Sequence, residues 1–214
     1  MLGYFRQNIG NYLKVNIVAY FFMILIFVLG VVVGALAIRV LPDEQKAEMI
    51  HYLHIFFKDL IQGVENTSSG GSLISSVMFN NAKTIILMWL LGFTIIGIPF
   101  VLFILFTRGF IIGFTVGFLV NEYVVRGLLF AIASVLPHNI FAIPAILVMS
   151  VSATKFSLLL VRRKTYGKMN IWYEVMRYSV LCICLLVMMF LAALLEVYIS
   201  PVFMKIVATL LIKE

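Results

Sequence analysis

The sequence predicts an all-α integral membrane protein with about five transmembrane helices, a re-entrant segment or half-helix, and amphipathic interfacial helices. Of its 214 residues, 64% are hydrophobic and only 12% are charged, whereas about 25% of residues are charged in soluble domains. Four long stretches contain no Asp, Glu, Lys or Arg: residues 16–38, 84–107, 127–154 and 178–195. Because a hydrocarbon core about 30 Å thick needs roughly 20 helical residues, stretches of this length can cross it.

The whole chain, residues 1–214, is expected to form one membrane domain. The expected spans lie near residues 17–38, 84–106, 109–125, 139–161 and 178–197. Since only Thr107, Arg108 and Gly109 separate the second span from the third, we expect a tight hairpin there. Residues 127–136 are too few to cross a bilayer, so we expect a half-helix or re-entrant segment that ends at Pro137.

The expected extramembrane parts are an outer segment at 41–83, a basic cytoplasmic loop at 162–177 and an outer tail at 201–214. Within the outer segment, apolar residues recur three or four positions apart, which is typical of an amphipathic helix. Such a helix would lie on the outer membrane face or against a partner protein. The residues expected to make the partner contact are Leu53, Phe56, Phe57 and Leu60.

The net charge of +7 is unevenly distributed along the chain, and this predicts its orientation. With a cytoplasmic N-terminus and an outer C-terminus, Glu174 is the only acid on the cytoplasmic side. The basic residues on that side are then Arg6, Lys14, Arg108, Lys155, Arg162, Arg163, Lys164, Lys168 and Arg177. This asymmetry agrees with the positive-inside rule. The positive charge therefore indicates topology and contact with membrane lipid, and we expect no nucleic-acid partner.

Glycines recur every four residues at two places in the expected spans. Gly30 and Gly34 share one face of the first span, and Gly109, Gly113 and Gly117 share one face of the third. Small residues at this spacing allow helix backbones to approach closely within a membrane. The two rows predict either packing inside one subunit or the seam of a homodimer.

Polar residues near the span boundaries are candidates for structural or functional roles. His138 and Asn139, which follow Pro137, could bind a ligand, sense pH, or hydrogen-bond the carbonyl groups that the two prolines leave free. Arg108 and an expected i, i+4 pair of Glu122 with Arg126 could mark a polar path. Alternatively, these charged side chains sit at the membrane edge, and Glu196 is expected there too. The spacing of the charges predicts no cluster of ionisable groups at mid-membrane.

The familiar signatures of catalysis are missing from the sequence. No Asp lies in an expected span, and neither a Gly-x-Ser-x-Gly elbow nor a Walker loop occurs. We therefore expect a protein that is not an enzyme and that has no cofactor or metal site.

Several runs along the chain resemble the stage II sporulation protein M family. The resemblance lies in Phe79–Pro99, Arg108–Gly113, Leu136–Ala145 and Ala192–Pro201, and the length and expected spans fit it across essentially the whole chain. Wider relatives often have Asn-Gly at Arg108-Gly109 and Gly-x-x-Glu at residues 139–142, so a Glu that served transport in relatives is missing here.

The resemblance implies a role in endospore formation, in the mother-cell or engulfing septal membrane. Members are similar in acting as a non-catalytic scaffold that anchors two peptidoglycan hydrolases for wall degradation and membrane migration. These partners are sporulation protein D, a lytic transglycosylase, and sporulation protein P, an amidase and endopeptidase. The alternative is a permease-like transport subunit that resembles an ABC-type membrane domain, in which Arg108, Pro137 and His138 would line a path.

Overall fold

The computed structural model describes residues 16–62, 70–166 and 171–212, and all of its regular secondary structure there is helical. The elements are α2 (Ile17–Val40), α3 (Asp43–Gln62), α4 (Gly70–Gly92), α5 (Gly97–Tyr166), α6 (Ile171–Leu194), the π-helix η1 (Leu195–Ile199) and α7 (Ser200–Ile212). Among these residues, three helical stretches are long and apolar enough to cross a membrane: Ile17–Val40, Gly97–Val161 and Ile171–Ile206. The prediction of an all-α membrane protein is confirmed, while the count of five spans stays a prediction.

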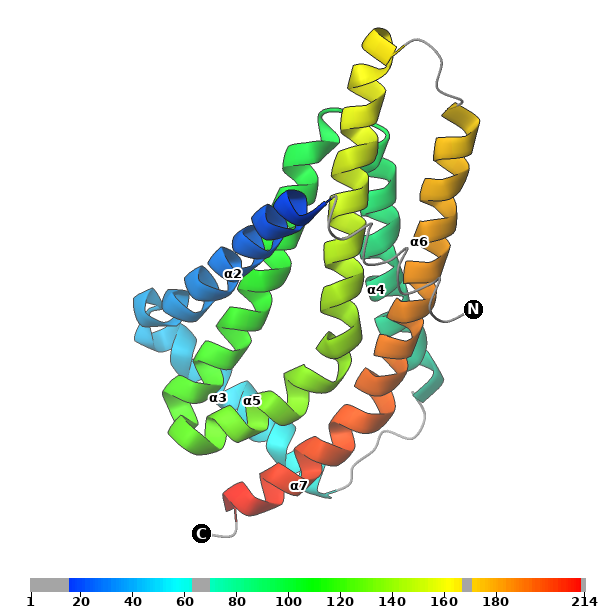
Figure 1. The fold of residues 1–214 in the computed structure, drawn as a ribbon. Coiled ribbons are helices and arrows are strands. Elements are labelled where there is room, and N and C mark those ends of the chain that lie inside the picture. Colours follow the sequence, from blue (N-terminus) through cyan, green and yellow to red (C-terminus); the bar gives the residue numbers. More distant parts are fainter. Residues whose placement is uncertain (1–15, 63–69, 167–170, 213–214) are drawn as a thin grey trace.

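The long helix α5 folds back on itself. A straight helix of its 70 residues would extend about 105 Å at 1.5 Å per residue. Val124 has φ 50° and ψ −119°, a conformation that β-branched residues rarely adopt, and the helix reverses there. We call residues 97–123 the first arm and residues 125–166 the second arm. Figure 1 shows the second arm crossing one end of the bundle before it runs back along the other helices.

The hairpin expected at residues 107–109 is wrong, and so is the continuous second span at 84–106. Arg108 and Gly109 lie inside the first arm, and the chain instead reverses at residues 93–96, between α4 and α5. This turn is close, because a Cβ on Gly97 would lie 1.8 Å from the Leu91 carbonyl oxygen. Ser157 Oγ donates to the Thr94 carbonyl oxygen at 2.8 Å. The turn consists of uncharged residues, so charge alone could not reveal it.

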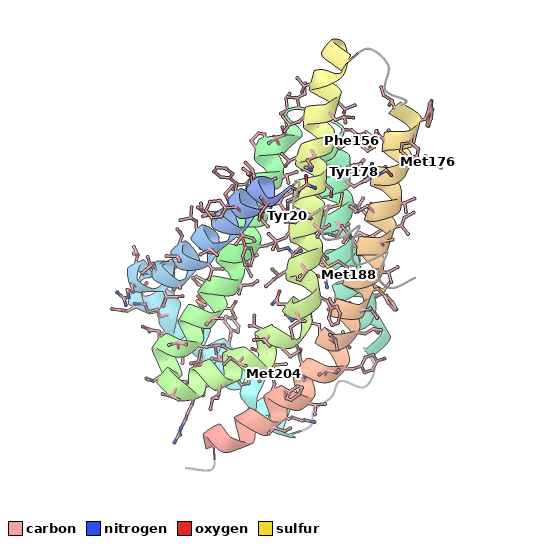
Figure 2. All side chains as sticks on the ribbon, in the orientation of Figure 1. Tyr20, Phe156, Met176, Tyr178, Met188 and Met204 are labelled. Atoms are coloured by element: carbon pink, nitrogen blue, oxygen red, sulfur yellow. The ribbon has the colours of Figure 1, made fainter. Side chains whose placement is uncertain are left out.

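The core lies where α4 and α6 pack against α5. Its fully enclosed side chains include Ile85, Met88, Leu105, Met149 and Met189. Near one end, aromatic side chains join three helices, because Phe156 stacks on Tyr178 with ring centroids 4.6 Å apart and Trp89 also stacks against Tyr178. Figure 2 labels Phe156 and Tyr178 close to one another between α5 and α6. The Tyr178 hydroxyl donates to the Trp89 carbonyl oxygen at 3.1 Å. These contacts hold α6 beside the last turn of α4.

The helices place particular segments at opposite ends of the bundle (Figure 1). The turn at 93–96, the end of α5 and the start of α6 share one end, and α3, α7 and the reversal at Val124 lie toward the other. The loop expected at 162–177 is shorter than predicted, because α5 continues to Tyr166 and α6 begins at Ile171. The tail expected at 201–214 is largely the helix α7. The expected half-helix at 127–136 is helical but continues through Pro137 as part of the second arm.

The two glycine rows face one another within the chain. A Cβ on Gly34 would lie 2.2 Å from the Phe110 carbonyl oxygen, and one on Gly113 would lie 2.0 Å from the Val31 carbonyl oxygen. The other three glycines, Gly30, Gly109 and Gly117, meet the facing helix in the same way. Residue numbers rise together along this contact, so α2 and the first arm run parallel. Both rows are therefore engaged in packing inside one subunit.

We predict that Gly113→Ala lowers the stability of the purified protein in detergent. The added methyl group must push α2 away from the first arm, and overpacking of this kind typically costs about 1–3 kcal/mol. Thermal unfolding followed by circular dichroism measures the loss. The matched control is Ile111→Val on the exposed face of the same helix, which should unfold close to wild type. Wild-type stability of Gly113→Ala would contradict the close backbone contact.

Candidate functional site: a polar cluster inside the helix bundle

Arg108 lies midway along the first arm and is only partly exposed. Its Nη2 donates a hydrogen bond to Oγ1 of Thr84 on α4. The Thr84 hydroxyl in turn donates to the Asn80 carbonyl oxygen at 3.2 Å, which leaves its oxygen free to accept from the guanidinium. The side chain expected at a membrane-edge hairpin thus points into the contact between α4 and α5.

Glu196 approaches the same region from η1. Asn81 is 8% exposed, and its Nδ2 donates to Glu196 Oε2 at 3.4 Å. Glu196 is also close enough to Arg108 for the two charges to interact. The carboxylate lies on a π-helical segment, and such local departures from α-helix occur frequently at functional sites. Glu196 was expected at the membrane edge, and the structure instead turns it toward the bundle.

His138 completes this group from the second arm. Its imidazole lies within electrostatic range of both Glu196 and Arg108. Its Nδ1 is enclosed within the bundle, and the backbone of Ser134, one turn earlier on the same helix, lies close to the ring. Asn81, Thr84, Arg108, His138 and Glu196 together form what we call the central polar cluster. The sequence predicted no cluster of ionisable groups at mid-membrane, and the structure brings Arg108, His138 and Glu196 within electrostatic range of one another.

The charges of the central polar cluster are opposite but are not in direct contact. Among the described residues, no ion pair within 4.0 Å joins Arg108 to Glu196. A guanidinium offers five N–H donors and a carboxylate about four acceptor sites, far more than the hydrogen bonds made here. Because unpaired polar groups are costly in an apolar interior, the arrangement suits bridging water or a polar ligand. The central polar cluster can hold α4, the two arms of α5 and η1 together, or it can form part of a polar path through the bundle.

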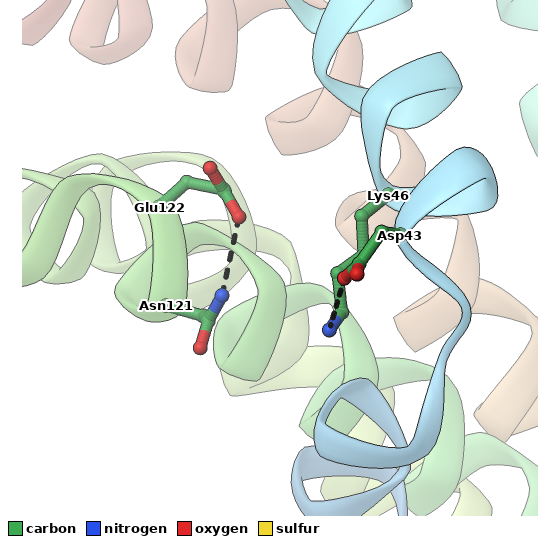
Figure 3. A network of polar contacts seen from close by, with 4 residues as sticks. All are labelled: Asp43, Lys46, Asn121 and Glu122. Atoms are coloured by element: carbon green, nitrogen blue, oxygen red, sulfur yellow. Dashed lines mark hydrogen bonds and ion pairs between the residues drawn. The ribbon is translucent and has the colours of Figure 1, made fainter.

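The other predicted polar residues have more local roles. Asn139 donates through Nδ2 to the Val135 carbonyl oxygen at 2.8 Å, one turn earlier on the same helix. Glu122 accepts a hydrogen bond from Asn121 at 3.1 Å, which Figure 3 shows beside the Asp43–Lys46 ion pair of α3. The reversal at Val124 separates Glu122 from Arg126. The i, i+4 spacing predicted for that pair is therefore interrupted.

The structure describes only part of the partner contact that the sequence predicts on α3. Leu53 packs against the small cluster of Leu119, Phe130 and Ala131. The side chains of Phe56, Phe57 and Leu60 lie outside the described residues. Among the side chains of α3 that the structure describes, the large exposed apolar ones are Tyr52, at 63%, and Ile55, at 45%.

Sequence reasoning assigned no role to Asn81 or Thr84, and it placed Glu196 at the membrane edge without a partner. Asn81 and Thr84 are three residues apart and share one face of α4, a spacing at which two polar residues in an apolar helix indicate a buried polar partner. Recognising that partner required the reversal at residues 93–96, which brings Arg108 back alongside α4.

We predict that Arg108 and Glu196 are energetically coupled. In a double-mutant cycle with Arg108→Met and Glu196→Met, the double variant should be more stable than the sum of the single losses implies, by about 0.5–3 kcal/mol. Chemical unfolding in detergent measures the four stabilities. The control cycle uses the half-exposed pair Arg177–Glu174, 3.9 Å apart, whose coupling should stay below about 1 kcal/mol. Additive losses at Arg108 and Glu196 would show that their charges do not interact.

Comparison with known proteins gives one family match. The model of the family described as stage II sporulation protein M matches residues 23–201, from the first turns of α2 to the start of α7. Neither the curated proteins nor the solved structures give a match. Because the matched stretch covers well over half of the 214 residues, the chain belongs to the stage II sporulation protein M family.

Proposed function

We propose that the protein is a non-catalytic membrane scaffold that recruits peptidoglycan hydrolases during engulfment in endospore formation. The observation that carries this proposal is membership of the stage II sporulation protein M family over residues 23–201, together with three helical stretches able to cross a membrane. The proposed partners are a lytic transglycosylase and an amidase or endopeptidase, the sporulation proteins D and P. The bond-breaking chemistry then belongs to these partners.

The proposed membrane arrangement has five crossings, made by α2, α4, the two arms of α5, and α6. The parallel contact of α2 with the first arm supports it, because both helices then start on the same side. That side carries Lys155 and Arg177 near the ends of α5 and α6, and the positive-inside rule makes it cytoplasmic. Helices α3 and α7 then lie on the outer side, where the cell wall and the hydrolases are.

The proposed docking surface is the exposed face of α3. Leu53 is already engaged with the protein's own helices, so a partner would meet Tyr52 and Ile55, which lie one turn apart on the same face. A partly exposed aromatic side chain with an apolar neighbour is a common anchor at protein interfaces. This surface revises the contact expected from the sequence, which centred on Leu53, Phe56, Phe57 and Leu60.

We predict that the double substitution Tyr52→Ala/Ile55→Ala reduces hydrolase binding about tenfold or more, because two anchors each worth about 1 kcal/mol or more are removed. The measurement is binding of the purified extracellular part of each hydrolase to protoplasts that display the protein. Trp172→Ala, an exposed aromatic at the opposite end, is the control and should bind normally. Undiminished binding by the double variant would remove this face from the proposal, and binding only to inverted vesicles would reverse the proposed topology.

A second candidate function is a permease-like transport subunit. The observation that favours it is the central polar cluster, since ionisable groups inside a membrane often mark a substrate or proton path. The test is proton flux into proteoliposomes loaded with a pH-sensitive dye. A flux that His138→Ala abolishes would support transport, whereas a rate equal to that of empty liposomes would argue against proton movement.

A further inference from the structure

A second polar site lies at the end of the bundle where α5 ends and α6 begins. It is a pocket of about 230 Å³ between these two helices. Its polar side comes from Lys155, Glu174 and Arg177 together with the almost fully buried Ser152, and its apolar side comes from Phe156, Leu159 and Leu181. A pocket with one charged and one apolar side is complementary to an amphiphile.

The charges of this pocket favour an anion. Lys155 and Arg177 are near enough to interact electrostatically, although like charges repel one another. Glu174 is the only acid among the described residues that line the pocket, and its carboxylate lies 3.9 Å from the Arg177 guanidinium. Two cations and one carboxylate leave the site with a net positive charge, which an anionic group between the two cations would neutralise.

The position of the pocket matches the headgroup layer of a bilayer. Trp172 and Tyr173, in the first turn of α6, are 78% and 63% exposed. Tryptophan and tyrosine side chains are enriched at the level where hydrocarbon meets water. Phe156 and Tyr178 line the same pocket, and Trp89 stacks against Tyr178.

We propose that this pocket binds the phosphate group of an anionic phospholipid, with Lys155 and Arg177 as its ligands and the lipid chain against Phe156, Leu159 and Leu181. Basic pockets between transmembrane helices are suited to such headgroups. A lipid chain lying along Leu159 and Leu181 would fill space between α5 and α6. The proposal does not depend on hydrolase recruitment.

The test is native mass spectrometry of the purified full-length protein equilibrated with equal amounts of phosphatidylglycerol and phosphatidylcholine. Wild type should retain phosphatidylglycerol at least fivefold more than phosphatidylcholine. Lys155→Gln/Arg177→Gln should lose this preference, and Glu174→Gln should increase it. Lys58→Gln, which removes the same charge from the exposed side of α3, is the matched control and should behave as wild type.

Two further measurements separate a loss of lipid binding from misfolding and from binding of free phosphate. Circular dichroism and size-exclusion chromatography verify that Lys155→Gln/Arg177→Gln is folded, and the single variants replace it if it is not. Inorganic phosphate is added in a separate arm, where a thermal stabilisation equal to that given by phosphatidylglycerol would show a site for free phosphate and overturn the lipid assignment. Equal retention of both lipids by wild type, or unchanged preference in the double and single variants, would also overturn it.

Discussion

The reversal of α5 at Val124 decides which side chains can meet inside this protein. Without it, a helix of 70 residues would carry Arg108 and His138 about 45 Å apart, at 1.5 Å for each residue between them. With it, the second arm returns beside the first, and both residues come within electrostatic range of Glu196. Gly127 contributes to the same reversal, because a Cβ at this position would lie 1.8 Å from the Leu119 carbonyl oxygen. A positive φ at Val124 is a strained conformation that the surrounding packing must maintain.

Two different kinds of contact then fix the helices. Along α2 and the first arm, glycines let backbones touch, which supplies dispersion contacts where lipid gives no hydrophobic drive for association. At the junction of α4, α5 and η1, the contacts are between polar side chains. The described residues supply partners for only a few of the hydrogen-bond donors and acceptors of these side chains. Polar groups left without partners in an apolar interior raise its free energy. This second junction therefore has unused hydrogen-bonding capacity that water or a polar ligand would satisfy.

The all-helical class and the glycine faces could be predicted from the sequence because they depend on composition and local spacing. The first and last residues of α2 could also be predicted, because the helix Ile17–Val40 closely matches the uncharged stretch at residues 16–38. The turn at 93–96 could not be predicted in the same way, since its residues are as uncharged as the spans beside it. Charge was therefore a misleading guide: Arg108 suggested a helix end, although its side chain finds Thr84 within the bundle. The pairing of Arg108 with Thr84 depends on this turn and could not be predicted without it.

The two ends of the protein differ in charge, and they therefore suit different kinds of partner. Lys155 and Arg177 line a pocket at the end that carries exposed Trp172 and Tyr173, where anionic headgroups would be the available partners. At the other end, α3 presents Tyr52 and Ile55 while its Leu53 is engaged with the protein's own helices. A partner there must recognise a narrow apolar face on a surface helix. The central polar cluster lies between these ends, and its residues come from α4, both arms of α5 and η1.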